Sequence, residues 1–439
     1  MYRKRFVSLL LALLLLPIGS SLRADTVDPA PGELTVYLLT MDHGDAVWEK
    51  FGHNAIWIRD RARGTDRVYN YGVFDFHSPG YWSRFVKGDW IYQIAASDIY
   101  NTVRQYRYLN RTVTAQELAL TQEQARELQE FLEWNLRPEN AEYLYDYYRD
   151  NCSTRVRDAL DRVLGGALRR ATEDQPSGTT YRWHSRRLLQ GDVAPYTGIA
   201  LALGTRVDRP ITLWEEMFLP SKLRERVREL TVPAEDGRMV PLVRAEEVLV
   251  EAIGRAPEAD APRSLTWRYL VVGVGVGLLI LAMGWVGEGR GIAGVTGRVA
   301  FSLLAGGWSL VVGFAGLLIA GLWFLTNHTF TYYNENLLQA TPFSLLLTVL
   351  LPALAFRARW AARPALGIAA AVAIASVAGA LLQLLPWFDQ VNGEIVALLL
   401  PPHLAIALAT FRLRRALYSP PADTSADRPV SRRSIAGGR

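Results

Sequence analysis

The sequence of 439 residues predicts an exported α+β domain followed by a bundle of about five transmembrane helices. Three observations lead to this expectation. A short apolar run opens the chain, the polarity is mixed up to about residue 265, and the composition becomes strongly apolar from Trp267 onwards. We therefore expect one domain outside the cytoplasmic membrane and one domain within it.

The N-terminus has the layout of a secretory signal. Basic residues at positions 3–5 precede an apolar run that begins at Phe6, and small residues lead to Ala24. The run is about a dozen residues long, which is short for a membrane span of roughly 20 residues. The sequence predicts a signal peptide over residues 1–24, with an uncleaved anchor as the alternative.

The exported domain is expected over residues 25–265, with a core at about 33–165 and an extension at 166–265. Its first half is rich in β-branched and aromatic residues, which favour strands. The strand-like segments include 33–40, 53–60 and 67–76. Apolar residues at helical spacing follow, so strands come before helices in this domain.

Two helices of this domain can be placed from their ends. The first follows Thr121, a residue suited to cap a helix. The second begins at Cys152, with Asp150 or Asn151 as its N-cap, and the glycine pair at 165–166 is expected to end it.

The C-terminal part contains five apolar runs. They cover residues 268–286, 299–325, 341–356, 365–386 and 395–411, and the third is the shortest. Because a span needs roughly 17–25 apolar residues, we expect a transmembrane domain over 266–412. A tail over 413–439, rich in Pro, Ser and Arg, is expected to be cytoplasmic and disordered.

Arginines in the loops predict the orientation of these helices. Loops 287–298 and 357–364 and the start of the tail contain arginine, whereas loops 326–340 and 387–394 contain no Lys or Arg. Positive loops lie inside, so the exported domain is expected on the outer side of a bacterial cytoplasmic (inner) membrane, as the signal peptide also requires. The net charge of +5 follows from these arginines and does not argue for nucleic acid.

Cys152 is the only cysteine, so the chain forms no internal disulfide. A lone cysteine is usually buried filler. In the first turn of a helix, however, unsatisfied N–H groups and the helix dipole favour the thiolate, and one such N–H group could face an oxyanion. The position predicts a nucleophile.

A cysteine nucleophile needs a base, which is normally histidine. We choose His53, which follows Gly52 at the head of a strand. His77 ends a strand and is a weaker alternative, and His43 lies in a polar turn where we expect it to be exposed. No cluster of His, Cys and carboxylates has the spacing of metal ligands, so no metal or cofactor is expected.

Five stretches resemble a known family. In order, they are "FGHNAI", "YNYGVFDF", "FVKGDWIYQIA", "YRYLNRTVTAQEL" and "YDYYRDNCSTRVRDAL". Together they resemble the DUF4105 family, whose exported domain is named for Lnb, a bacterial lipoprotein N-acyltransferase. The resemblance continues through residues 203–220 and 326–338. It implies a circularly permuted NlpC/P60 (papain-like) fold, in which histidine precedes cysteine along the chain.

The resemblance assigns Cys152 as nucleophile and His53 as general base. The third catalytic residue is expected on the strand that pairs with the histidine strand. A hairpin turn centred near 63–64 would place His53 opposite roughly residues 73–75, so Asp75 is the geometric candidate. Asn70 and His77 are the alternatives.

The external loop 326–340 contains His328, Asn334 and Asn336 beside two tyrosines. It is either an interfacial aromatic belt with polar loop residues or the lining of a lipid or substrate entrance. We predict these three residues as substrate-binding.

The resemblance implies a cysteine-dependent acyltransferase. An acyl chain would move from a phospholipid to Cys152, and then to the N-terminal amine of a diacylglyceryl-cysteine lipoprotein. Two other readings stay open. One is an NlpC/P60-like hydrolase of wall peptide or lipid, and the other is a non-catalytic membrane protein in which the cysteine is packing. The sequence predicts neither the donor lipid nor the oligomeric state.

Overall fold

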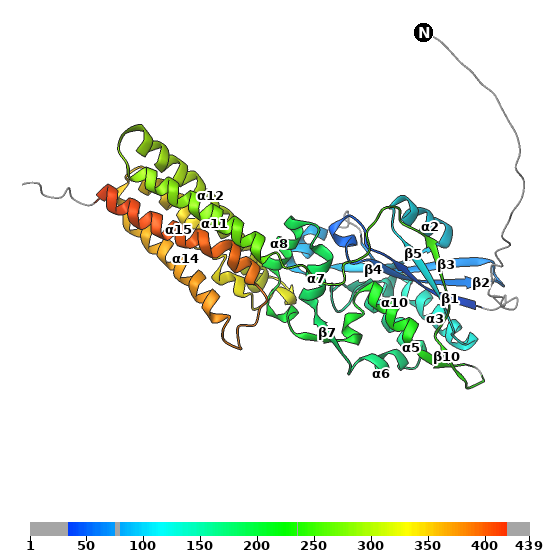
Figure 1. Ribbon diagram of the computed structural model, residues 1–439. Coiled ribbons are helices and arrows are strands. Elements are labelled where there is room, and N and C mark those ends of the chain that lie inside the picture. Colours follow the sequence, from blue (N-terminus) through cyan, green and yellow to red (C-terminus); the bar gives the residue numbers. More distant parts are fainter. Residues whose placement is uncertain (1–33, 75–79, 235, 419–439) are drawn as a thin grey trace, which may run out of the picture.

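The computed structural model describes residues 34–74, 80–234 and 236–418. A sheet domain lies at one end of the elongated molecule and a helix bundle at the other (Figure 1). The signal peptide expected over residues 1–24 lies outside the described residues. The two-part organisation expected from the change in composition is therefore present.

The sheet domain is built on a seven-stranded antiparallel sheet with the order β11-β5-β1-β2-β3-β4-β6. Its strands are β1 (Leu34–Met41), β2 (His53–Asp60), β3 (Thr65–Val73), β4 (Ile91–Asp98), β5 (Val113–Leu118), β6 (Glu142–Leu144) and β11 (Val243–Val250). The three strand-like segments named from the sequence form β1, β2 and β3. Because the pairing of β1 with β2 ends at Met41 and His53, the histidine lies at one end of the sheet.

Helices cover both faces of this sheet (Figure 1). They are α3 (Gln122–Asn135), α5 (Cys152–Val163) and α10 (Pro220–Glu229) on one face and α2 (Ile99–Tyr108) on the other. Side chains of a strand alternate between the two faces. In β2, Ile56 and Ile58 pack on the α5 side, whereas Ala55 and Trp57 pack on the α2 side.

The ends of α3 and α5 are those expected from the sequence. Thr121 caps α3. Asn151 caps α5, with its Oδ1 accepting from the backbone N–H groups of Ser153 and Thr154, both at 2.9 Å. The glycines at 165–166 follow α5 with φ of 60° and 81°, a left-handed conformation that favours glycine.

Shorter elements complete the sheet domain. The helices are α1 (Tyr81–Lys87), α4 (Pro138–Ala141), α6 (Ala167–Thr172), α7 (Tyr181–Leu189), α8 (Val193–Ala202) and α9 (Leu213–Glu216). Two small sheets pair β7 (Pro176–Thr180) with β8 (Pro210–Thr212) and β9 (Thr231–Pro233) with β10 (Met239–Pro241).

Four helices of the described residues are long and apolar enough to cross a membrane. They are α11 (Thr266–Glu288), α12 (Gly291–Leu325), α14 (Ala362–Leu382) and α15 (Gly393–Tyr418). The third expected span forms α13 (Ser344–Ala355), which has only 12 residues because the start of that apolar run stays outside the helix. Helix α15 continues beyond residue 412, where the disordered tail was expected to begin; residues 419–439 lie outside the described part.

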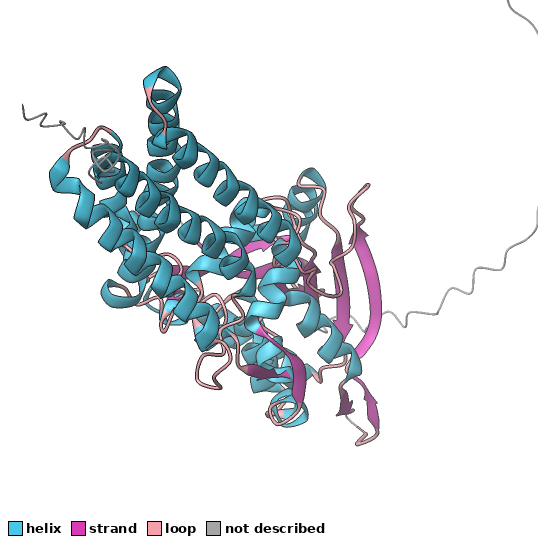
Figure 2. Cartoon of the chain, turned by 60° about the vertical axis from the view of Figure 1, so that its left-hand side comes forward, coloured by secondary structure: helices cyan, strands magenta, loops and turns pink. Residues whose placement is uncertain are grey.

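Helix α11 packs closely against α15 (Figures 1 and 2). A Cβ added to Gly273 would lie 2.6 Å from the backbone oxygen of Leu398, and one added to Gly284 would lie 2.8 Å from the Cβ of Ala409. Small residues allow membrane helices to approach in this way.

A buried carboxylate joins the two parts of the molecule. Glu394, at the start of α15, accepts from Arg186 at 2.6 Å, from the Tyr196 hydroxyl at 2.6 Å and from the backbone N–H of Leu265 at 2.7 Å. Arg186 and Tyr196 belong to α7 and α8 of the sheet domain. These bonds fix the sheet domain to the bundle.

Candidate functional site

Cys152 is the first residue of α5, as the sequence predicts. The backbone N–H groups of Asn54, Ser153 and Cys152 itself face its sulfur and lower the pKa of the thiol. Burial acts in the opposite direction and is the larger effect, so the pKa of Cys152 is raised above its ordinary value. The helix start therefore favours the thiolate as expected, but in the free protein burial outweighs this effect.

His53 is the first residue of β2. Gly52 before it has φ of 80°, and a Cβ there would lie 2.9 Å from the backbone oxygen of Met41. Glycine is thus required by a close approach of the backbone to β1, which is the kind of contact that the sequence suggested at this position.

Asn70 of β3 orients the imidazole. Its Oδ1 lies 3.2 Å from Nε2 of His53, and its Nδ2 donates to Ser97 Oγ and to the Val68 carbonyl, both at 3.4 Å. Since Oδ1 can only accept, Nε2 of the ring donates and Nδ1 keeps a lone pair. Nδ1 is therefore free to take a proton.

Burial lowers the pKa of His53 to about 4. The charge of Arg111 acts in the same direction, and the bond to Asn70 acts against it. The imidazole is consequently neutral near pH 7, which is the form that a general base requires.

Asn70 is one of the two alternatives for the third catalytic residue, and it is the residue that bonds to His53. Asp75 and His77 lie outside the described residues. The hairpin pairs Asp60 with Thr65, so its turn is centred one residue earlier than the sequence suggested. Continuing this register would place residue 72 opposite His53, which makes Asn70 a diagonal neighbour on the same face of the sheet.

Cys152 and His53 come to the same end of the sheet. The residues that follow them are bonded, since the Ser153 hydroxyl lies 2.9 Å from Oδ1 of Asn54. The structure records no hydrogen bond between the Cys152 sulfur and the imidazole. By strand alternation His53 shares the α2 face, whereas Cys152 packs with the core on the α5 face.

Gly72 of β3 lies beside Cys152. It has φ of 86°, and the pairing of β3 with β4 is irregular between Asn70 and Val73. A Cβ at this position would lie 3.3 Å from the Cβ of Cys152. A side chain at this position would therefore crowd the nucleophile.

Arg111 is a residue of this site that the sequence analysis did not single out. It is 4% exposed, its Nε donates to the Asp42 carbonyl at 2.8 Å, and its Nη1 lies 3.6 Å from Glu49 Oε1. Its Nη2 is buried without a hydrogen-bond partner. The charge lowers the pKa of both Cys152 and His53. Arg111 is one of many arginines, and no sequence pattern around it indicates that it lies near the thiol and the imidazole.

Aromatic rings lead from the thiol towards the bundle. Tyr92 and Tyr145 stack with their ring centroids 4.1 Å apart, and the charge of an ionised Cys152 would raise the pKa of both phenols. Trp90 is the next ring, 6.3 Å from Tyr92 and 6.0 Å from Tyr145. Trp90 in turn contacts His328 at 5.6 Å between ring centroids.

Helix α1 lies where this aromatic path reaches the bundle. The Lys87 carbonyl at its end accepts from the backbone N–H of Asn327 at 2.7 Å, directly after α12. Phe85 stacks on Trp90 at 4.9 Å. Its neighbour Val86 is 63% exposed, so apolar surface is presented at the level where a membrane-spanning helix ends.

Residues 23–187 match the family model of the Lnb N-terminal periplasmic domain. The matched segment includes Cys152, His53, Asn70 and Arg111 and ends before the apolar helices. The match and the four long apolar helices together fit a membrane protein with an extracytoplasmic domain. The comparisons with curated proteins and with solved structures found no match.

The residues predicted to bind substrate separate into two groups. His328 lies against Trp90, beside the aromatic path. Asn334 and Asn336 are 1% and 0% exposed, and their amide groups donate to carbonyls of residues 200–202 at 2.7–3.1 Å. This geometry favours a structural role for the two asparagines, which hold the external loop to α8, while substrate contact by His328 stays a prediction.

Two other histidines of the sheet domain have different surroundings. His184 is fully buried, with Nε2 at 3.0 Å from Glu216 and Nδ1 at 3.0 Å from Nε of Arg187. Both ring nitrogens are therefore engaged in hydrogen bonds. His43 is partly buried rather than exposed as expected.

Proposed function

We propose that this chain is a membrane-bound thiol acyltransferase of a bacterial cytoplasmic (inner) membrane, with its sheet domain on the periplasmic side. It takes an acyl chain from a phospholipid onto Cys152 and passes it to the N-terminal amine of diacylglyceryl-cysteine lipoproteins. The order of His53 and Cys152 along the chain supports the further proposal that the sheet domain is a permuted relative of the papain-like NlpC/P60 fold.

One observation carries the proposal. A cysteine at a helix start shares one end of the sheet with His53, which Asn70 orients. Aromatic rings connect this end of the sheet to the level where α12 ends. A thiol–imidazole pair performs acyl transfer. Its position beside apolar surface favours a substrate that is held in a bilayer.

In the first half of the reaction, Nδ1 of His53 accepts the proton of the Cys152 thiol. The sulfur attacks the ester carbonyl of the phospholipid, and the C–O double bond opens to an oxyanion. The backbone N–H groups around the sulfur and the charge of Arg111 stabilise this negative charge. The ester C–O bond then breaks, the leaving alkoxide takes the proton from the imidazolium, and lysophospholipid departs from the thioester.

In the second half, the free amine of the acceptor attacks the thioester carbonyl. His53 takes a proton from the nitrogen and returns it to the sulfur as the C–S bond breaks. The products are an amide and the original thiol, so atoms and charges balance without a cofactor.

The geometry of the free protein also sets a requirement. The Cys152 sulfur and the imidazole must come within hydrogen-bond distance in the reacting complex, although they share no hydrogen bond before substrate binds. Because a Cβ at position 72 would lie 3.3 Å from the Cβ of Cys152, the glycine keeps this approach unobstructed. A bound acyl chain along the aromatic path would also exclude the water that hydrolysis needs.

The test is mass spectrometry of lipoprotein N-terminal peptides from a host that lacks its own N-acyltransferase. We expect N-acylated peptides with the wild-type chain and none with Cys152→Ala. Arg162→Gln is the matched control, because Arg162 lies on the far end of the same helix and its side chain is exposed.

Two outcomes would contradict the proposal. If the wild-type chain is present in the membrane and yields no N-acylation, the acyltransferase reading fails, and release of free fatty acid or cleaved wall peptide would identify the hydrolase. If Cys152→Ala acylates as well as the control, the nucleophile is wrong. A thioester on Cys152 would be seen as an acyl mass increase that hydroxylamine removes. Its presence would show that Cys152 is a nucleophile and not only a packing residue.

A further inference from the structure

A cavity of about 600 Å³ lies at the end of the helix bundle that is remote from the sheet domain. It is lined by Arg290, Gly291, Ile292, Val295, Thr296, Arg298 and Arg357. These residues come from the start of α12 and from the loop after α13. The arginine-rich loops predict that this end of the bundle is cytoplasmic, so the cavity and the thiol lie on opposite sides of the membrane.

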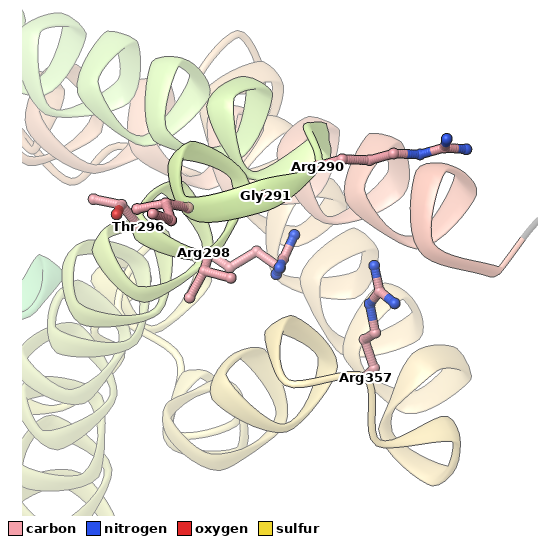
Figure 3. Close-up of a pocket in the computed structure, with 7 residues that line it drawn as sticks. Arg290, Gly291, Thr296, Arg298 and Arg357 are labelled. Atoms are coloured by element: carbon pink, nitrogen blue, oxygen red, sulfur yellow. The ribbon is translucent and has the colours of Figure 1, made fainter.

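Two guanidinium groups converge on this cavity. Figure 3 shows that the side chains of Arg298 and Arg357 point into the same space, whereas Arg290 extends away from them. Arg298 is only 9% exposed. Arg357 comes from a different element and sits directly after α13 at a φ of 65°, a conformation that is uncommon for a residue with a side chain.

The two positive charges have no acidic partner among residues 34–74, 80–234 and 236–418. Arg298 uses Nη1 to donate to the backbone oxygens of Gly287 and Gly289, at 2.9 and 3.4 Å. A guanidinium has five N–H donors, so further donors remain on the cavity side. The neighbouring carboxylate, Glu288, is occupied by Arg412 at 2.8 and 3.2 Å.

We propose that this cavity binds a phosphate group. Arginine pairs bind phosphate by charge-assisted hydrogen bonds, and the start of α12 adds the positive end of a helix of 35 residues. Two sources share this chemistry, a phospholipid headgroup of the cytoplasmic leaflet and a soluble phosphate compound. The exposed side chains of Ile292 and Val295 at the rim would accompany the chains of a lipid.

Native mass spectrometry of the full-length protein in detergent tests this site. Phosphatidylglycerol is titrated into wild type, Arg357→Gln, Arg298→Gln and Arg363→Gln. Arg363 is exposed in the first turn of α14, next to this arginine-rich loop, and does not line the cavity, so it controls for the general charge of that surface. We expect one retained phospholipid, with affinity reduced about tenfold or more by each of the first two changes and unaltered by the third.

The arms of the experiment separate the two sources. If the site holds a lipid, excess inorganic phosphate should leave the bound lipid in place. If inorganic phosphate displaces the lipid from the wild type and not from Arg357→Gln, the site binds soluble phosphate. Equal losses in all three variants would overturn the proposal in favour of diffuse surface charge, and so would an unchanged Arg357→Gln. Arg298 also caps the end of α11, so its variant is interpreted only with an unaltered melting temperature; Arg357 carries the test alone if that variant does not fold.

Discussion

Replacing Asn70 tests whether this residue orients the general base. In Asn70→Ala, Nε2 of His53 loses its partner at 3.2 Å. A hydrogen bond of this kind contributes about 1 kcal/mol, which corresponds to a ratio of about fivefold between the two tautomers or ring orientations. We therefore expect the rate of Cys152 acylation to fall about fivefold or more, while Cys152→Ala abolishes it.

Asn70→Asp separates positioning from simple damage to the fold. A carboxylate beside the ring favours the imidazolium and raises the pKa of His53 from about 4 towards its ordinary value. Neutral imidazole is then lost at higher pH, so the acid limb of the pH–rate profile moves up, whereas Asn70→Ala moves it down. Single-turnover acylation of Cys152 by phospholipid from pH 4 to pH 8, read by intact mass, measures this, because the thiol and the imidazole meet only in the reacting complex.

Asn101→Ala is the matched control, because Asn101 is exposed on α2 and does not contact the ring. If Asn70→Ala and Asn101→Ala have the same acylation rates and the same acid limb as the wild type, Asn70 does not orient the base and the mechanism is wrong at this step.

Three further outcomes are expected. Gly72→Ala should lose acyl transfer and be less stable than Gly64→Ala, because both place a side chain at positive φ, at a cost of about 1–2 kcal/mol, but only the side chain at position 72 would lie 3.3 Å from the Cβ of Cys152. Thermal melting and peptide acylation compare the two variants, and equal behaviour would show that the glycine at position 72 has no special role. Glu394→Gln should lower the free energy of unfolding by about 2 kcal/mol, because it removes the charge partner of the partly buried Arg186. An unchanged denaturant midpoint would contradict this. Trp90→Ala should slow acylation of the thiol by phospholipid much more than acylation by a soluble thioester, whereas Trp134→Ala, which removes an exposed ring on α3, should alter neither rate. If Trp90→Ala slows acylation by both donors equally, the aromatic rings do not form a path for lipid.

The sequence carried the features that depend on local chemistry. Helix caps at Thr121 and Asn151 follow from side chains that accept backbone N–H groups, and the two-part organisation follows from hydropathy. The apolar run at 341–356 was expected to span because composition alone was counted, yet only 12 of its residues are helical in α13.

The site was predicted less completely, because it depends on register and burial. A shift of one residue in the centre of the β2–β3 turn changes which residues of β3 lie near His53, and Asn70 meets the ring diagonally, whereas Asp75 lies outside the described residues. The pKa of Cys152 depends on how much protein surrounds the sulfur, which outweighs the helix start. Arg111 comes to the site through tertiary packing, for which the sequence has no local signal.

The bonds between the sheet domain and the bundle have a consequence for the choice of acceptor. Asn334 and Asn336 of one loop and Glu394 of α15 bond to the sheet domain, so in the proposed reaction the thiol stays at a constant height above the lipid surface. The acceptor must then bring its amine to the height of the thiol. An amine attached directly to its own lipid anchor has a high effective concentration at that height, whereas an amine on a long flexible tether is diluted over a larger volume. Tether length by itself would discriminate between acceptors, whatever amino-acid sequence they carry.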